Sequence, residues 1–169
     1  MIPFDDYVVA RGPALLRLAF LLVRDHHLAQ DLVQEALTRS YRRWRFIERD
    51  DPDSYVRRAI LNQFLSWRRR RSFWEWPTTD PAGDAEPFVA DLTGAVDDRQ
   101  DLKHLLQCLP RQQRAVIVLR YYEDLDDKAI GILLDCSQAT VRAHASRALA
   151  RLRAASQSPE RSMGRGHDD

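Results

Sequence analysis

Residues 137–152, SQATVRAHASRALARL, combine arginines with small side chains and contain no acidic residue. At 3.6 residues per turn, one face of the predicted helix is apolar and the other is polar, small and basic. Small residues let a helix approach a surface closely, so that arginine can reach phosphates or base edges. The pattern favours contact with nucleic acid, although a solvated basic helix would look similar. The candidate contact residues are Gln138, Ala139, Thr140, Arg142, Ala143, Ser146 and Arg147.

A second predicted helix, residues 126–133, directly precedes this one, and Leu134-Asp135-Cys136 forms the turn between them. Asp135 stands where a turn of this kind needs a left-handed residue, a conformation that Asp adopts more readily than most side chains. Ser137 is placed to cap the following helix with its hydroxyl group. Residues 126–153 therefore predict a helix-turn-helix, whose second helix would enter the major groove of DNA.

The remaining periodicity is also helical. Apolar residues recur at helical spacing over residues 4–24, with Pro13 expected to kink or restart the helix, and again over residues 29–44 and 54–71. DDPDS at residues 50–54 predicts a break and a cap at Asp53 or Ser54. No segment alternates with period two. The predicted fold class is all-α: two small helical domains joined by a flexible linker, the second containing the helix-turn-helix.

The net charge of +1 hides a strongly uneven distribution. Residues 1–71 carry a net charge of +5 and residues 102–153 carry +4, whereas residues 72–101 carry −7. Two basic segments joined by an acidic one suggest two surfaces for a polyanion. The predicted boundaries are a first domain at 1–71, an acidic, proline-rich linker at 72–97, a second domain at 98–155, and a disordered tail at 156–169.

The sequence lacks the residues that several classes of function require. Cys108 and Cys136 form no C-x-x-C pair, so neither a zinc site nor a disulfide framework is indicated, and no cofactor motif is present. The acidic start, MIPFDDY, is no signal peptide, and the nine-residue apolar run from Leu15 to Val23 is too short to span a bilayer. We therefore expect a cytoplasmic chain with no membrane insertion, no metal and no catalytic residues.

Two motifs in order resemble one family. Asp31-Leu32-Val33-Gln34-Glu35-Ala36, followed by SYVRRAILNQFLSWRRRR at 54–71, resembles the first conserved domain of the sigma-70 family of transcription initiation factors. Residues 109–153, from LPRQQRAVIVLRYYED onward, resemble the family's carboxy-terminal domain. The short length and two-domain layout are similar to its extracytoplasmic-function (ECF) group.

The resemblance implies a subunit that binds core RNA polymerase, through its β′ and β subunits, and promoter DNA. Asp31, Gln34 and Glu35 match the family's docking site for the clamp helices of β′. Arg57, Arg58, Asn62, Gln63 and Trp67 match the surface that binds the −10 element, and a basic helix with interleaved aromatic residues suits single-stranded DNA. Residues 138–147 of the helix-turn-helix would bind the −35 element. The two domains could close on each other when inactive, held by an anti-sigma factor.

Three other functions remain open from the residues alone. A stand-alone helix-turn-helix transcriptional regulator would use the same helix, but residues 1–71 show no heptad seam for dimerisation. A metal-dependent nuclease would need clustered carboxylates, whereas the acids here lie mainly in the linker and on one helix face. A protein-binding adaptor is the third. Loss of polymerase binding on changing Asp31 and Glu35 would distinguish a subunit of RNA polymerase from these three alternatives.

Overall fold

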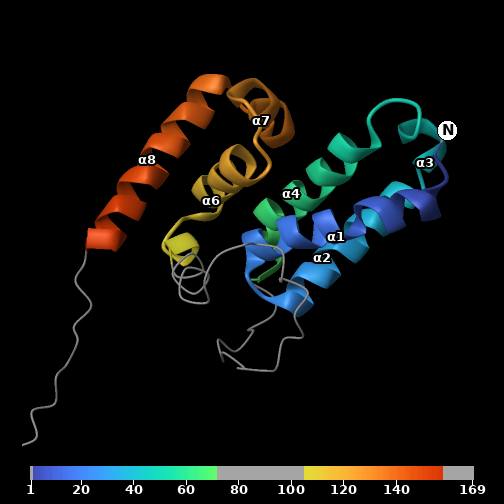
Figure 1. Cartoon of the computed structure of the whole chain (residues 1–169), viewed down its shortest axis with the longest axis horizontal. Coiled ribbons are helices and arrows are strands. Elements are labelled where there is room, and N and C mark those ends of the chain that lie inside the picture. Colours follow the sequence, from blue (N-terminus) through green and yellow to red (C-terminus); the bar gives the residue numbers. More distant parts are fainter. Residues whose placement is uncertain (1, 72–104, 158–169) are drawn as a thin grey trace, which may run out of the picture.

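The computed structural model of the chain describes residues 2–71 and 105–157, and side chains for residues 2–66 and 105–156. Every regular element in these ranges is helical, as the sequence predicts. The predicted linker at 72–97, the side chain of Trp67 and the predicted tail beyond Gln157 lie outside what is described. Figure 1 shows the described helices as two groups, one from each half of the sequence.

The first group contains α1 (Phe4–Val23), α2 (His26–Tyr41), the short α3 (Trp44–Ile47) and α4 (Pro52–Arg71). Asp25 caps α2 by accepting a hydrogen bond from the amide of Leu28, at 2.8 Å. The predicted apolar stripe of α4 is confirmed at Val56, Ile60 and Phe64, which are almost fully buried. Within this group, α2 packs extensively against both α1 and α4.

Two boundary predictions for this group need correction: the helix does not restart at Pro13, and α4 is capped by a different residue from those predicted. α1 continues through Pro13 without a break in the helix, and the carbonyl that Pro13 leaves unbonded belongs to Val9, which is 79% exposed to solvent. α4 is capped by Asp51 and not by Asp53 or Ser54: the Asp51 carboxylate accepts from the amide of Ser54 at 3.1 Å. Pro52 then occupies the first helical position, where its missing N–H costs nothing.

The second group contains α6 (Arg111–Ile117), the π-helical turn η1 (Val118–Tyr122), α7 (Asp127–Leu134) and α8 (Gln138–Gln157). In η1 the amide of Glu123 donates to the carbonyl of Val118, which is five residues back. This wider turn ends the α6 segment and leads into the helix-turn-helix. α8 packs against α6 and α7, burying Val141, Ala145 and Ala148.

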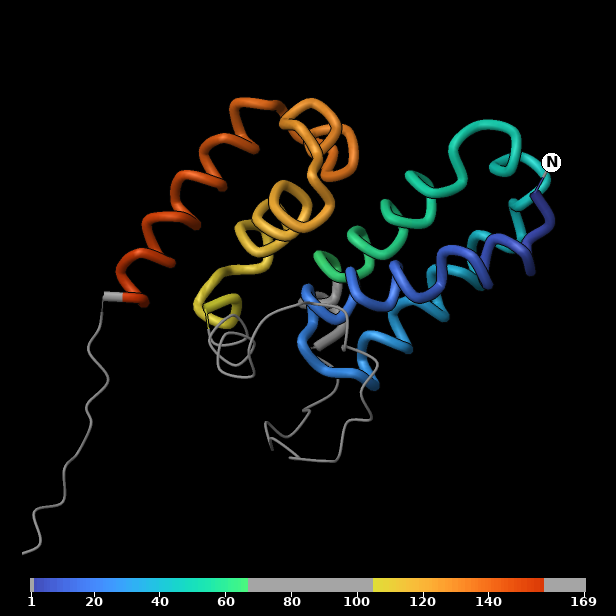
Figure 2. Tube along the Cα trace, in the orientation of Figure 1, coloured from blue at the N-terminus to red at the C-terminus, as the bar shows by residue number. Residues whose placement is uncertain are grey.

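The two groups pack against each other. α1 and α4 both contact α6, α4 contacts α7, and α1 contacts η1. Buried apolar side chains from both groups form one continuous cluster. The Cα trace in Figure 2 shows α4 lying between the rest of the first group and α7. We call this packing of the two groups the closed arrangement.

Candidate nucleic-acid and protein interfaces

The predicted DNA-reading face of α8 is open to solvent. Its apolar stripe faces α6 and α7, so the opposite face is left free of the rest of the described chain. The exposed residues are Gln138, Ala139, Thr140, Arg142, Ala143, Ser146 and Arg147, which is the complete predicted set. A slim face with two arginines and no acid can approach the floor of a major groove.

The turn between α7 and α8 is built as the sequence predicts. Asp135 adopts the left-handed conformation, with φ 54° and ψ 50°. The Ser137 hydroxyl accepts a hydrogen bond from the amide of Thr140 at 3.1 Å, which caps α8. A Cβ atom at Gly131 would lie 2.7 Å from the carbonyl oxygen of Cys136. Glycine at this position of α7 is therefore required by the close approach of the turn.

Arg142 on α8 has one acidic neighbour. Its guanidinium lies 3.8 Å from the carboxylate of Asp127, which also forms a close ion pair with Arg120. The Arg142 side chain remains 61% exposed. An ion pair this long and this exposed contributes little, so Arg142 can turn toward a phosphate or a base edge.

On α2 the three predicted polymerase-docking residues differ in environment. Asp31 and Gln34 are exposed. Glu35 is half-buried, forms an ion pair with Arg39, and accepts a hydrogen bond from the side-chain amide of Gln63. Glu35 therefore joins α2 to α4, and Asp31 and Gln34 form the more accessible part of this face.

A groove of about 680 Å³ runs between α1 and α2 beside Gln34. Its lining includes Val8, Leu16, Val33, Gln34, Leu37 and Tyr41. Tyr41 falls within the apolar periodicity of residues 29–44, but its side chain is 63% exposed at the last residue of α2. The groove adds an apolar surface to the polar face that the sequence singled out.

The predicted −10 residues on α4 also divide into two kinds. Arg58 and Asn62 are exposed, whereas Gln63 is half-buried in its contact with Glu35. The Arg57 side chain is only 18% exposed. Part of the predicted −10 surface on α4 is therefore exposed to solvent, and another part is engaged in contacts within the protein.

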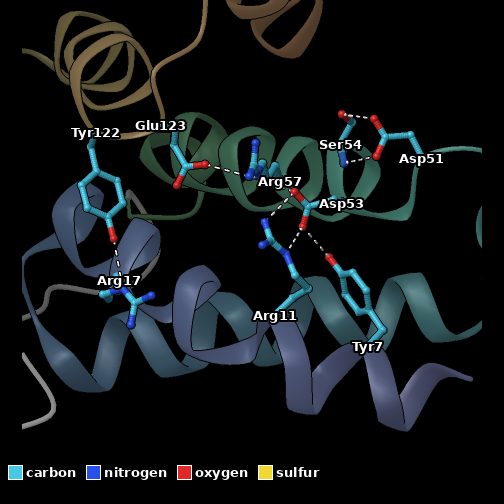
Figure 3. Close-up of polar contacts among 9 residues, drawn as sticks. All are labelled: Tyr7, Arg11, Arg17, Asp51, Asp53, Ser54, Arg57, Tyr122 and Glu123. Carbon is cyan, nitrogen blue, oxygen red and sulfur yellow. Dashed lines mark hydrogen bonds and ion pairs between the residues drawn. The ribbon is translucent and has the colours of Figure 1, made fainter. Parts of the chain in front are cut away.

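Arg57 is held by two carboxylates. One of its terminal nitrogens lies 2.8 Å from Asp53 on the same helix and 2.9 Å from Glu123, which follows η1 in the other group. Asp53 in turn binds the Arg11 guanidinium at 2.8 and 2.9 Å and accepts from the Tyr7 hydroxyl at 3.3 Å (Figure 3). Burial, reinforced by the Asp53 charge, raises the pKa of Tyr7, so this phenol stays neutral and donating.

The contact made by Glu123 is not predicted by the sequence. Its side chain is 10% exposed, and it reaches the Arg57 guanidinium across the closed arrangement. In the sequence it is one acid among several in YYEDLDD, and no spacing rule connects it with residue 57.

Among the described residues no group of three or more His, Cys, Asp or Glu side chains could hold a metal ion. Within those residues, too, every helix is too short or too polar to cross a bilayer.

Two family models match the chain in the order of its two groups. Sigma-70 region 2 matches residues 8–73, and Sigma-70 region 4 matches residues 99–152. A helix-bundle first unit followed by a helix-turn-helix with an open basic face is the layout of a transcription initiation factor. The chain belongs to the sigma-70 family.

Named relatives agree with this assignment. The chain is 40% identical over 154 residues to the RNA polymerase sigma-E factor of Streptomyces coelicolor, covering 90% of this chain and 85% of the relative. It is 30% identical to the ECF RNA polymerase sigma factor SigE of Mycolicibacterium smegmatis, covering 89% of this chain and 60% of that one. Among solved structures, the sigma factor RpoE of Bartonella quintana, crystallised with the anti-sigma factor NepR, is 25% identical with a TM-score of 0.69, covering 89% of this chain and 94% of that one.

Proposed function

We propose that this chain directs promoter-specific transcription initiation by binding core RNA polymerase and recognising two promoter elements. The observation that carries the proposal is the open, acid-free face of α8 on a capped helix-turn-helix. That face meets the requirements for entering a major groove, and it would bind the −35 element through residues 138–147. The likeness of both halves to sigma factors supports the same function.

The first group would dock on the polymerase through α2. Asp31 and Gln34 are exposed beside the α1–α2 groove, and together they offer an acidic and polar edge next to an apolar surface. Such a combination suits a basic, amphipathic helical partner such as the clamp helices of β′. Glu35 contributes by fixing α2 on α4 through Gln63.

α4 would bind the −10 element after the DNA opens. Arg58 and Asn62 are exposed on this helix. Asn62 carries both a donor and an acceptor and so can read a base edge, while Arg58 can pair with a phosphate. The chain itself would perform no nucleotide chemistry, which the polymerase supplies. An anti-sigma factor is a proposed partner, as RpoE was crystallised with one.

The decisive experiment is a binding and transcription assay on one double variant. Asp31→Arg with Gln34→Lys should abolish capture by immobilised core polymerase, and with it transcription from a pool of genomic fragments. Asp50→Arg is the matched control, because it reverses an exposed acidic charge on the loop before α4 and leaves the proposed docking face intact. Normal polymerase binding by the double variant would contradict the docking site.

The same assay separates the sigma factor from a stand-alone regulator. A stand-alone regulator would bind duplex DNA equally well in both variants and would stimulate a polymerase that already carries another sigma factor. A sigma factor supports initiation only when the polymerase lacks one. Absence of initiation by wild-type chain plus core polymerase on every fragment would overturn the proposed function.

A further inference from the structure

Asp127, on α7, lies between two arginines of the second group. One oxygen of its carboxylate forms a close ion pair with Arg120 of η1, and the other lies 3.8 Å from a terminal nitrogen of Arg142 on α8. The side chains of Asp127 and Arg120 are 23% and 25% exposed, so both are largely covered by the protein. Arg142 is the most exposed member of this row of three charges, and it belongs to the predicted DNA-reading face.

α7 does not need Asp127 as its cap. Asp126 is the N-cap residue, and its carboxylate accepts a hydrogen bond from the amide of Ala129 at 2.7 Å. The carboxylate of Asp127 is left to side-chain partners, and the hydrogen bond that it accepts from Arg120 fixes its direction. Asp127 is therefore held in place by one arginine while it faces another.

The helices that carry Asp127 and Arg142 have a fixed relation to each other. Ile130 of α7 and Val141 of α8 are fully buried, and the close approach of the turn at Gly131 leaves no room for a shift. Figure 1 shows α7 beside the amino-terminal turns of α8. A side chain on such rigid elements gives the Arg142 guanidinium a fixed point of contact.

Arg147, the other arginine of the same α8 face, differs from Arg142. Within the described part of the chain, no acidic side chain lies within ion-pairing distance of Arg147. An arginine without such a contact can follow any phosphate. A guanidinium that is held on one edge presents its remaining N–H donors in a fixed plane. A fixed plane favours bidentate contact with the O6 and N7 atoms of a guanine.

The contact between Asp127 and Arg142 is weak in water and becomes stronger against DNA. At 3.8 Å and with an exposed arginine, the pair adds little to the stability of the free chain. When DNA covers the pair, water leaves and the effective dielectric constant falls, so the attraction between the two charges increases. The same carboxylate repels every nearby phosphate. Asp127 therefore opposes binding through phosphates alone and permits a contact in which Arg142 meets a base edge.

We propose that Asp127 is a positioning residue of the −35 surface, which holds Arg142 toward a guanine edge and away from the phosphate backbone. The proposal rests on the proposed function, because it requires the α8 face to lie in a major groove. Arg120 supports this role by fixing the carboxylate. Asp127 itself contacts no base, and its effect is to widen the difference in affinity between right and wrong sequences.

The test is competitive run-off transcription by core polymerase carrying the chain. One template has a promoter mapped by run-off transcription, and the others have single base-pair changes in its −35 element. The wild-type chain should favour the unchanged template by about tenfold or more at one G·C pair. Asp127→Asn should reduce this ratio to less than about threefold and leave the ratios at the other positions unchanged. Asn has the shape of Asp and the Asp126 cap remains, so the variant should fold.

The salt dependence of promoter binding provides a second readout that a purely structural role would not change. If Arg142 moves from a base edge to a phosphate in Asp127→Asn, the slope of log affinity against log salt concentration should become steeper by up to about 0.9, the value of one phosphate contact.

Three control variants separate positioning from a general effect of charge. Asp124→Asn removes the same charge from a nearby exposed residue and should give wild-type ratios. In an Arg142→Ala background, Asp127→Asn should have no further effect on the ratio, because the effect passes through that guanidinium. In an Arg147→Ala background, Asp127→Asn should keep its full effect.

Two results would overturn the positioning role. One is equal ratios for wild type and Asp127→Asn, whatever the change in melting temperature. The other is an equal effect of Asp127→Asn in the Arg142→Ala and Arg147→Ala backgrounds. Failure of the wild-type chain to initiate with core polymerase on every fragment would instead remove the proposed function, and this inference with it.

Discussion

α4 and α8 are both 20-residue helices rich in arginine, and both are proposed to bind DNA, yet the fold treats them differently. α8 is packed on one side, and its whole predicted contact face is exposed. α4 contacts helices of both groups, and its Arg57 is engaged by two carboxylates. The proposed −35 surface is therefore exposed in this structure, whereas part of the proposed −10 surface is engaged in packing between the two groups.

The largest expected effect is on the core around α4. Phe64 is 2% exposed and lies under the Arg111 guanidinium, so Phe64→Ala removes packing on both sides of the closed arrangement. We expect the free energy of unfolding, measured by urea denaturation, to fall by about 3–5 kcal/mol. Phe46→Ala, at a side chain that is 83% exposed, should change it by no more than about 0.5 kcal/mol. A small loss at Phe64 would mean that α4 is no more deeply embedded than α8.

The next effect concerns the turn that orients α8. Gly131→Ala places a methyl group against the Cys136 carbonyl and should destabilise the chain by about 1–3 kcal/mol, the usual cost of overpacking. Gly12→Ala is its opposite in α1: a Cβ there meets nothing within 4 Å. Because alanine is the better helix former, this variant should gain about 0.5–1 kcal/mol. Thermal melts of the two variants should therefore shift in opposite directions.

A third experiment tests whether Arg142, on the exposed face of α8, contributes to DNA binding without contributing to the stability of the fold. Arg142→Ala should weaken binding to a promoter fragment by about 1–3 kcal/mol if the side chain reads a base, with little change in unfolding free energy. Fluorescence anisotropy on a fragment mapped by run-off transcription would measure it. Arg45→Ala removes the same charge from an exposed position on α3 and should bind normally. Equal losses in the two variants would mean that only overall charge matters.

The smallest effect compares the helix caps. Ser137→Ala on α8 and Asp51→Ala on α4 should each cost about 1 kcal/mol. Of these two capping side chains, Asp51 is the one that titrates. Hydrogen bonds from the Ser54 hydroxyl and amide lower the pKa of Asp51 below its ordinary value. A lowered folded-state pKa gives stability that is present above the unfolded pKa, about 3.9, and is lost as the pH falls through the folded value. The difference between wild type and Asp51→Ala should therefore shrink below about pH 4, while that for Ser137→Ala persists.

How much the sequence could predict follows from how local each feature is. The α7–α8 turn and the Ser137 cap depend on residues within about one helical turn of each other, and both were predictable. The exposed α8 face was predictable because helical periodicity places the apolar and the polar side chains of residues 138–152 on opposite sides. The end of α2 was not: an apolar pattern running through Tyr41 gave no sign that the helix stops there. The cap of α4 was misplaced by a few residues for the same reason, since several acids in DDPDS could serve.

The functional surfaces show the same division. The family resemblance implied that Arg57 and Glu35 are candidate contact residues, but partners that they have in the structure, Glu123 and Gln63, lie on other elements, distant in the sequence. Glu123 and Gln63 find those partners only through packing of α4 against its neighbours. A single sequence therefore identifies residue types suited to binding, and the tertiary structure decides which of them are occupied.

The chain of charges from Arg11 through Asp53 and Arg57 to Glu123 has a consequence for exchanging modules between relatives. A hybrid that joins the first group of this protein to a foreign second group inherits Arg57 without its counterpart. Such a hybrid can keep each proposed recognition surface intact and still lose the ion pair between Arg57 and Glu123, because its two residues belong to different groups. Glu123 would have to be transplanted along with the domain boundary.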